Sequence, residues 1–256
     1  MKFSLYQAAR TVSSLLPLSQ GIPLEAIGHT PHKRIRRPQG EHWAIVAKTG
    51  DGKTVCVKHL LEAYRQKYPF LQTYIVDSKD LGDFTAKDGV VTRSLVPPPP
   101  LMQPGQRQVW QPIEKDNLLY YDEFFTQILY NNKPALVVID ESKNLKNGAR
   151  YPKGYELLLS QGRMAGIFCF TNYQEIANGL RQGLSQAKHV IGFSVLNPYD
   201  ESYLKQALKM RAGVSLERPR YSLWYVNRDT MATPKLYPGY KDLIAELFPQ
   251  KRRRTT

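Results

Sequence analysis

The chain has 256 residues, 42% of them hydrophobic, which suits one α/β core with small appendages rather than several large domains. Its formal net charge is +14, with 36 Lys and Arg against 22 Asp and Glu, so charge predicts a polyanionic partner, nucleic acid before an anionic lipid surface. No apolar run is long enough to cross a bilayer, so no transmembrane segment of its own is expected.

Residues 1–40 are predicted to form an extension ahead of the folded core. A short amphipathic stretch leads into a basic cluster at residues 32–38. Two interpretations of this cluster stay open: it contacts nucleic acid, or it is a solvated lead-in to the first strand.

The first core unit is a strand at residues 43–47 and a helix at residues 55–64, joined by a glycine-containing loop. The two glycines of this loop permit positive φ, which brings backbone N–H groups close to phosphate oxygens. Lys53 can place its ammonium at the β- and γ-phosphates, and the hydroxyl of Thr54 is suited to bind Mg²⁺. The residues expected around the phosphates are Thr49, Gly50, Asp51, Gly52, Lys53, Thr54 and Val55. The loop therefore predicts binding of ATP with Mg²⁺.

A second strand is predicted at residues 71–77, where it ends in an acid. Residues 95–113 are rich in proline and are predicted to be an extended surface loop, with a polyproline ligand site as the lesser alternative. An amphipathic helix over residues 116–131 then leads into an apolar run at residues 135–139. The strand at residues 43–47, the helix after it and the strand at residues 71–77 have the order that begins a parallel sheet.

Two carboxylates follow the apolar run directly. Its β-branched composition is typical of a strand buried on both faces. Asp140 is placed to hold Mg²⁺ through water, and Glu141 to orient and polarise the water that attacks the γ-phosphate. The pair predicts hydrolysis, since an enzyme that transfers the phosphoryl group to an acceptor has no use for Glu141.

A polar loop at residues 142–154 comes next, and its cations lie close to the two carboxylates in sequence. They are Lys143, Lys146, Arg150 and Lys153. Either they contact a nucleic-acid backbone in a way that changes with nucleotide state, or they belong to a solvated loop. Both interpretations stay open.

The rest of the core is predicted as two further helix and strand pairs. These are a helix at residues 155–161, a strand at residues 166–170 that ends in Thr171 and Asn172, a helix at residues 173–186 and a strand at residues 189–195. A polar pair at the end of a strand lies where ligands bind in open parallel sheets.

The predicted fold class is α/β: a P-loop NTPase of the RecA-like type, with a mostly parallel sheet of five or more strands flanked by helices. Short extensions stand at both ends, and the C-terminal one contains a basic helix at residues 203–211 and a strand at residues 221–226. The predicted organisation is an N-terminal extension (1–40), an ATPase core (41–200), a helix and strand extension (201–250) and a disordered basic tail (251–256).

Six short motifs, taken in chain order, carry a resemblance to a known family. They lie at residues 49–54, 76–79, 137–141, 160–167, 171–172 and 182–187. In this order they resemble the FtsK/HerA superfamily of ring-shaped, DNA-pumping ATPases. Within that superfamily the chain is similar to the genome-packaging ATPases of icosahedral viruses with an internal membrane, such as tectivirus-like phages and turreted archaeal viruses. The match covers roughly residues 40–200, and the block around Gly162 and Arg163 is its discriminating part.

The resemblance implies an ATPase that moves double-stranded DNA into a preformed capsid as a homohexameric ring. Its implied place is the host cytoplasm or the packaging vertex of the virion, where a capsid vertex or viral membrane protein can be a further partner. Arg163 is implied as an arginine finger that acts on the γ-phosphate bound by a neighbouring subunit. Relatives carry a glutamine that senses the γ-phosphate where this chain has Asn172, so sensing falls to Asn172 or to Gln174.

A protein of a different class stays as the alternative: a dimeric ATPase switch of the partition or site-selection kind, which binds DNA or membrane in a nucleotide-dependent way. Lys48 favours it, because such proteins carry a second lysine early in the loop that reaches across a dimer. They generally lack the acid pair at residues 140 and 141, and they have a glycine where Thr49 stands. A structural protein with a vestigial nucleotide site is disfavoured, since Lys53, Thr54 and both acids are present.

Overall fold

The structure is a computed structural model that describes residues 38–249, apart from residues 80–81, 146, 148–149, 177–180, 196, 212 and 231. The strands in this part of the chain are β1 (His42–Val46), β2 (Gln72–Val76), β3 (Val90–Ser94), β4 (Arg107–Pro112), β5 (Ala135–Ile139), β6 (Ile167–Tyr173), β7 (His189–Gly192), β8 (Leu223–Asn227) and β9 (Lys235–Tyr237). The helices are α1 (Lys53–Lys67), α2 (Leu118–Tyr130), α3 (Lys153–Ala165), α4 (Arg181–Gln186), α5 (Pro198–Ala207) and α6 (Tyr240–Leu247), with short 3₁₀ helices η3 (Ser142–Leu145) and η4 (Arg228–Thr230).

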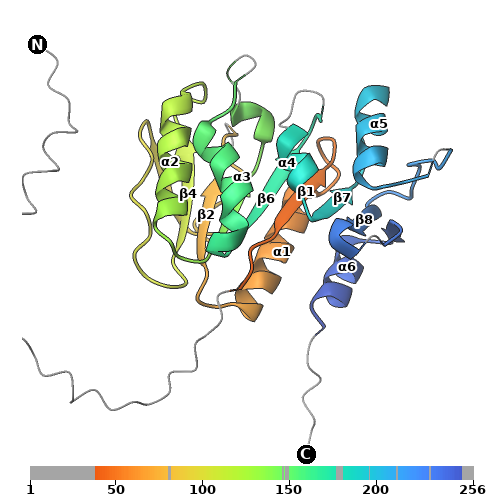
Figure 1. The fold of residues 1–256 in the computed structure, drawn as a ribbon, viewed down its shortest axis with the longest axis horizontal. Helices are drawn as coiled ribbons and strands as arrows, with labels where there is room; N and C mark the ends of the chain where they lie inside the picture. The colour runs from red at the N-terminus through yellow and green to blue at the C-terminus, as the bar shows by residue number, and fades with distance from the viewer. Residues whose placement is uncertain are drawn as a thin grey trace, which may run out of the picture. The chain divides into compact units, whose positions relative to one another are not determined.

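The described strands form one sheet in the order β3-β4-β2-β5-β6-β1-β7-β8-β9 (Figure 1). Every pair from β3 through β7 is parallel, and β8 and β9 continue the sheet in antiparallel fashion. The predicted α/β class with a mostly parallel sheet of five or more strands is confirmed.

Helices cover both faces of the sheet (Figure 1). On β1, Trp43 and Ile45 pack in the core shared with α1 and α6, whereas Ala44 and Val46 pack in the core shared with α4 and α5. Helices α2 and α3 pack on the sheet through a third core, with Val137 of β5. Because strand side chains alternate between two covered faces, β1, β2 and β5 are buried at every position, as the continuous apolar run of β5 predicted.

The proline-rich segment differs from its prediction. Strand β4 occupies residues 107–112, so the prediction of a loop over residues 95–113 is wrong there, and β3 at the sheet edge was not predicted at all. Pro112 is compatible with β4 because it is the last residue of the strand. Most of β3 is solvent-exposed, so it lacks the hydrophobic pattern by which a strand is recognised.

The predicted boundaries of the segments before α3 and after β6 are wrong. The loop predicted over residues 142–154 begins with η3 and ends at Lys153, where α3 starts. The helix predicted from residue 173 does not begin there, because β6 continues to Tyr173. Helix α4 is described over Arg181–Gln186. Strand β6 runs this far since it pairs with β5 on one side and with β1 on the other, as far as Tyr173 opposite Val46.

Helix α5 and strand β8 were predicted in kind but not in extent. Helix α5 begins at Pro198, ahead of the predicted residue 203, because the Asn197 side chain accepts a hydrogen bond from the backbone N–H of Asp200 at 2.8 Å and Pro198 suits the first helical turn. Strand β9 and helix α6 were not predicted. Residues 1–37 and 250–256, which include nearly all of the basic cluster and the whole basic tail, lie outside the described residues. Among the described helices, none has the length and hydrophobicity needed to span a membrane.

Candidate functional site

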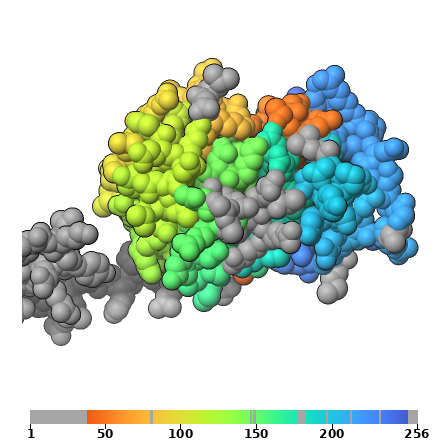
Figure 2. Space-filling model, turned by 90° about the horizontal axis from the view of Figure 1, so that it is seen from above, coloured from red at the N-terminus to blue at the C-terminus, as the bar shows by residue number. Residues whose placement is uncertain are grey.

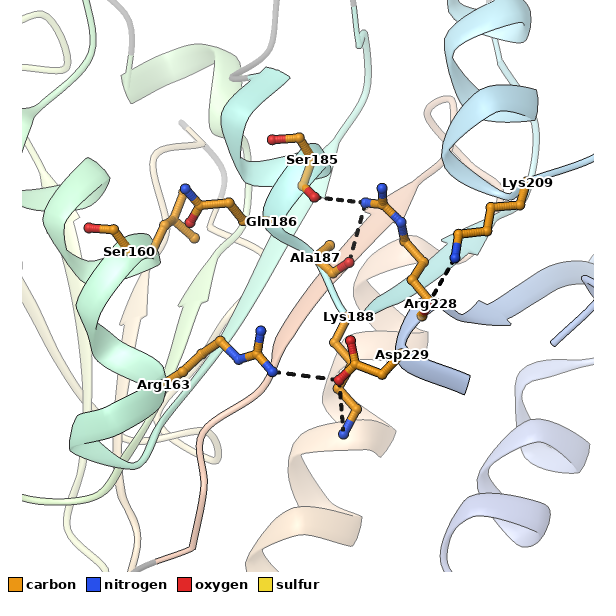
Figure 3. A pocket seen from close by; sticks show the side chains of 10 residues that line it. Ser160, Arg163, Ser185, Gln186, Ala187, Lys188, Lys209, Arg228 and Asp229 are labelled. Carbon is orange, nitrogen blue, oxygen red and sulfur yellow. Dashed lines mark hydrogen bonds and ion pairs between the residues drawn. The ribbon is translucent and has the colours of Figure 1, made fainter. Parts of the chain in front are cut away.

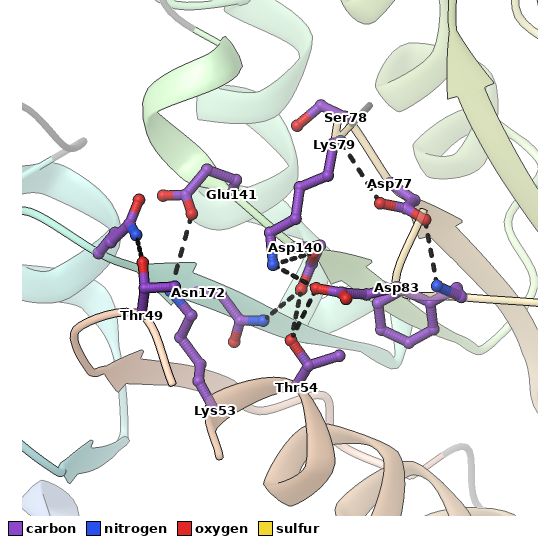
Figure 4. Close-up of polar contacts among 12 residues, drawn as sticks. Thr49, Lys53, Thr54, Asp77, Ser78, Lys79, Asp83, Asp140, Glu141 and Asn172 are labelled. Carbon is purple, nitrogen blue, oxygen red and sulfur yellow. Dashed lines mark hydrogen bonds and ion pairs between the residues drawn. The ribbon is translucent and has the colours of Figure 1, made fainter. Parts of the chain in front are cut away.

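Three neighbouring strands bring most of the predicted site residues to one edge of the sheet. Strand β6 lies between β5 and β1, and parallel strands end at the same edge, so the loop after β1 meets the acids after β5 and the polar residues of β6 (Figure 4). Figure 2 looks onto this edge and shows the orange atoms of the loop region at the surface. A cavity of about 800 Å³, here called the phosphate pocket, opens there between the phosphate loop of residues 48–54 and side chains that follow β2, β5 and β6. Outside the loop its lining includes Ser78, Lys79, Gly82, Asp83, Glu141, Lys143 and Gln174.

The loop between β1 and α1 has the conformation that its glycines predicted. Gly50 and Gly52 both have φ of 88°, and the position of a Cβ on either has no neighbouring atom within 4 Å. Helix α1 starts at Lys53 with no side-chain hydrogen bond at its cap, so the first turn offers free backbone N–H groups to the pocket. The loop is therefore an open anion cradle at a helix N-terminus.

Lys53 and Glu141 lie next to each other inside the pocket. The Lys53 Nζ atom is 3.7 Å from Glu141 Oε2, and the two side chains are 7% and 3% exposed. Burial lowers the pKa of Lys53, although Glu141 and Asp140 oppose this. Burial also raises the pKa of Glu141, against the opposing effects of Lys53, Lys143 and Lys79. The second carboxylate oxygen of Glu141 is buried and has no hydrogen-bond partner among the described residues, so it is free to accept a proton or bind water.

Asp140 lies deeper than Glu141 and is held by several neighbours. Thr54 Oγ1 is 3.4 Å from Asp140 Oδ1, and Asn172 donates from its side-chain nitrogen to the same oxygen at 3.0 Å. A hydroxyl and a carboxylate at this distance are the oxygen donors that Mg²⁺ prefers. The residues present therefore fit a magnesium ion held by Thr54 and Asp140, while Asn172 positions the carboxylate.

Lys79 and Asp83 belong to the same cluster, although neither was predicted to have a role. Lys79 Nζ is 2.9 Å from Asp140 Oδ2 and also pairs with Asp83, and Thr54 Oγ1 is 3.3 Å from Asp83 Oδ2. Burial opposes the charge of Lys79, but Asp140 and Asp83 together raise its pKa. Lys79 follows the β2 strand in one of the motifs that resemble the family, which was the only signal for it in the sequence.

Gln174 lies nearer the phosphate loop than Asn172 does. Its side-chain nitrogen contacts Thr49 Oγ1, and its oxygen accepts a hydrogen bond from Lys143 Nζ at 2.8 Å. Lys143, proposed above as a nucleic-acid contact, thus lies at the phosphate pocket, with Glu175 at 3.9 Å. Arg150 and Lys153 are exposed, the latter at the first position of α3, and Lys146 lies outside the described residues.

Arg163 lies at the opposite edge of the sheet from the phosphate loop. It is in the last turn of α3, just before β6 begins, and its backbone oxygen accepts from Gly40 ahead of β1. Its guanidinium is 3.5 Å from Asp229 in a cavity of about 470 Å³ that Lys188, Lys209 and Arg228 also line (Figure 3). Since the loop and Arg163 stand at different ends of the parallel strands, Arg163 does not reach the phosphate pocket of its own subunit.

The phosphate loop also makes a contact that the sequence did not indicate. Arg218, from the segment between α5 and β8, forms an ion pair of 2.9 Å with Asp51, and Ser194 donates to the same carboxylate. These residues are separated from Asp51 by 167 and 143 positions, so no local pattern could reveal them.

No family model and no curated protein matches the chain. Among solved structures it is similar to the DNA-packaging ATPase B204 of Sulfolobus turreted icosahedral virus, with 17% identity and a TM-score of 0.65 over 79% of this chain and 98% of that one. The genome packaging NTPase B204 of Sulfolobus turreted icosahedral virus 2, solved with ATP-gammaS, gives 16% identity and a TM-score of 0.61 over 78% of this chain and 97% of that one.

A further likeness is to the pCW3 conjugation coupling protein TcpA, solved as a monomer with ATPgS, at 14% identity and a TM-score of 0.54 over 82% of this chain and 65% of that one. At these identities the likeness establishes the fold. The chain therefore has the α/β P-loop fold of the genome-packaging ATPases of turreted icosahedral viruses, the fold that the order of its motifs predicted.

Proposed function

We propose that this protein is an ATPase that drives double-stranded DNA into a viral capsid as a ring of identical subunits. The observation that carries the hydrolytic part is the buried contact between Lys53 and Glu141, beside Thr54 and Asp140, in a pocket closed on one side by a glycine cradle. These residues supply the positive charge, the metal ligands and the base that hydrolysis of a triphosphate requires.

In this proposal Glu141 accepts a proton from water as the water oxygen bonds to the γ-phosphorus. The bond between that phosphorus and the bridging oxygen then breaks, and ADP and phosphate leave. Lys53 stabilises the negative charge of the β- and γ-phosphates, and Thr54 and Asp140 would hold Mg²⁺, which would supply further positive charge to the site. Gln174, which already contacts Thr49 at the loop, is the proposed γ-phosphate sensor.

The position of Arg163 supports its role as a finger that acts on a neighbouring subunit. It lies at the edge of the sheet away from its own phosphate loop, and its side chain is 36% exposed. The next residue, Met164, is an apolar side chain with 92% exposure, as expected of a surface that a neighbour covers. A head-to-tail contact closes into a ring when the rotation between subunits closes, and in the proposed ring ATP lies between subunits.

The proposed nucleic-acid partner rests on the net charge of +14 and on the exposed cations Arg150 and Lys153. The solved structures of similar fold include a DNA-packaging ATPase and a conjugation coupling protein, which supports DNA as the partner. The proposed place of action is the packaging vertex, in the host cytoplasm or on the virion, with a capsid or viral membrane protein as the receiving partner.

A dimeric nucleotide switch is the second candidate, because Lys48 is a lysine early in the loop and it lines the phosphate pocket. The two candidates differ in assembly and in turnover. A packaging motor forms a ring with an ATP analogue and hydrolyses ATP faster with duplex DNA, whereas a switch of this kind forms a dimer.

The test is ATP turnover with and without duplex DNA, for the wild-type protein and for Glu141→Gln, beside mass determination with an ATP analogue. We expect DNA to stimulate the wild-type rate, and Glu141→Gln to lower kcat by about 100-fold or more while ATP still binds. Glu62→Gln on the exposed surface of α1 is the matched control and should turn over ATP like the wild type. Unchanged turnover in Glu141→Gln contradicts the hydrolytic role, and a dimer with the analogue contradicts the ring.

A further inference from the structure

The phosphate loop contains one acid, Asp51, between its two glycines of positive φ. A carboxylate in a loop whose backbone N–H groups receive a triphosphate opposes the binding of that anion. Sequence alone gives no reason for an acid at this position, because the cradle needs only backbone N–H groups and Lys53.

Arg218 neutralises this acid from a distant part of the chain. Its Nη2 atom is 2.9 Å from Asp51 Oδ2, and the two side chains are 7% and 16% exposed. Ser194 Oγ donates to the same oxygen of Asp51. In Figure 2, blue atoms of the C-terminal third lie beside the orange atoms of the loop region. A pair this far removed from water is screened less by salt than a surface ion pair.

The guanidinium of Arg218 is itself fixed by two backbone oxygens, one just after β7 and one in the residue that follows Arg218. Arg218 Nε donates to the backbone oxygen of Phe193, and its Nη1 donates to the oxygen of Pro219 at 3.2 Å. The backbone around Phe193 also holds the phosphate loop, since Phe193 N–H donates to Val46 at 2.8 Å and the oxygen of Ser194 accepts from Lys48 N–H at 3.2 Å. Arg218 therefore connects the tip of the loop to the same strand end that supports its base.

We propose that Arg218 is a positioning and charge-neutralising residue of the nucleotide site, and that the segment between α5 and β8 is thereby part of the phosphate-binding apparatus. The inference rests on the proposed function, because it names a determinant of triphosphate affinity at that site. Arg218 pairs with the loop's own acid, so that the charge of Asp51 does not oppose the phosphates of the substrate.

The test measures nucleotide affinity by calorimetry in the Glu141→Gln background, where hydrolysis does not interfere. Arg218→Ala should weaken ATP binding by about tenfold or more, because an unpaired carboxylate then faces the phosphates. The loss should be largest for ATP, smaller for ADP and smallest for AMP, since the repulsion grows with ligand charge. Arg220→Ala removes an equal charge from an exposed neighbour stacked on Tyr221, and it should leave all three affinities within about twofold.

A second substitution separates charge neutralisation from a merely structural contact. Asp51→Asn added to Arg218→Ala removes the unpaired acid while keeping a side chain that Ser194 can bond, so it should restore ATP affinity to within about threefold of the parent. Circular dichroism confirms that each variant is folded.

Different results would contradict the role of Arg218 and the proposed ATPase function. If Arg218→Ala binds ATP as the parent does, or if the double variant is no better than Arg218→Ala, Arg218 does not act by neutralising Asp51. If the parent protein itself does not bind ATP, the proposed function is wrong and the Arg218 variants are not the cause.

Discussion

At the scale of single residues, the two adjacent acids after β5 have different surroundings. Asp140 is bound by Thr54, Asn172 and Lys79, so its position is fixed from three sides. Glu141 has one oxygen near Lys53, and its other oxygen has no hydrogen-bond partner in the described part of the chain. Two carboxylates that differ in this way suit two roles, metal binding for Asp140 and proton transfer for Glu141.

The environment of Glu141 predicts how turnover depends on pH. Burial raises the pKa of this carboxyl above its ordinary value, and a base acts only in its ionised form. Turnover at saturating Mg·ATP should therefore be constant above the raised pKa and should fall as pH decreases through it, at a higher pH than for an ordinary glutamate. The measurement is kcat across the acid range, with thermal melts at each pH to confirm that the protein stays folded.

Substitutions of two lysines, one near Glu141 and one away from it, test this dependence of kcat on pH. Lys143 lowers the pKa of Glu141 through its charge, so Lys143→Met should move the acid limb to higher pH. Lys153→Met removes a charge from the start of α3, outside the residues that line the phosphate pocket, and should not move the limb. An acid limb at the ordinary glutamate value, or one that Lys143→Met leaves in place, counts against Glu141 as the base.

At the scale of elements, local signals predicted the unit of β1, phosphate loop and α1 well. Glycines at positive φ, an apolar strand and an amphipathic helix are all encoded within residues 42–67. The strand β5 and its two acids were predicted for the same reason. The end of β6 depends on pairing with β1, which is distant in the sequence, and β3 is a largely exposed strand that pairs with β4, so neither carries an equivalent local signal.

The same distinction applies to the site. Lys53, Thr54, Asp140 and Glu141 could be predicted, since each stands at a recognisable position in a motif. Arg218 could not, because its contact with Asp51 depends on how the segment after α5 returns to the sheet. The surroundings of Arg163 could not be predicted either, since Asp229 reaches it from η4.

The packing of α2 against α3 predicts the effect of one small substitution. A Cβ added at Gly154 would lie 2.5 Å from the backbone oxygen of Asp122, so Gly154→Ala must separate the two helices. This crowding should cost about 1–3 kcal/mol, more than the roughly 1 kcal/mol by which alanine favours a helix. Thermal unfolding should show a lower Tm for Gly154→Ala. Ser160→Ala, at an exposed position of the same helix, is the control, and an unchanged or higher Tm for Gly154→Ala would contradict the close packing.

At the scale of the whole molecule, two charged cavities stand at opposite edges of one sheet. The phosphate pocket lies where the parallel strands end, and the cavity around Arg163 lies where they begin. In the single chain Arg163 pairs with Asp229, which is 48% exposed and also lies 3.8 Å from Lys188. In the ring proposed above, the second cavity of one subunit would lie at the phosphate pocket of the next, where a γ-phosphate would replace Asp229 as the partner of Arg163.

In the proposed ring, one subunit's Glu141 and its neighbour's Arg163 form a single hydrolytic site. The decisive measurement is the ATP turnover of Arg163→Ala and Glu141→Gln proteins, each alone and mixed in equal amounts. Each variant alone should be nearly inactive. Mixing should restore turnover to about a quarter of the wild-type rate, because about that share of interfaces then combines an intact Glu141 with an intact Arg163. A mixture no more active than its components, or an Arg163→Ala protein as active as the wild type, contradicts the claim.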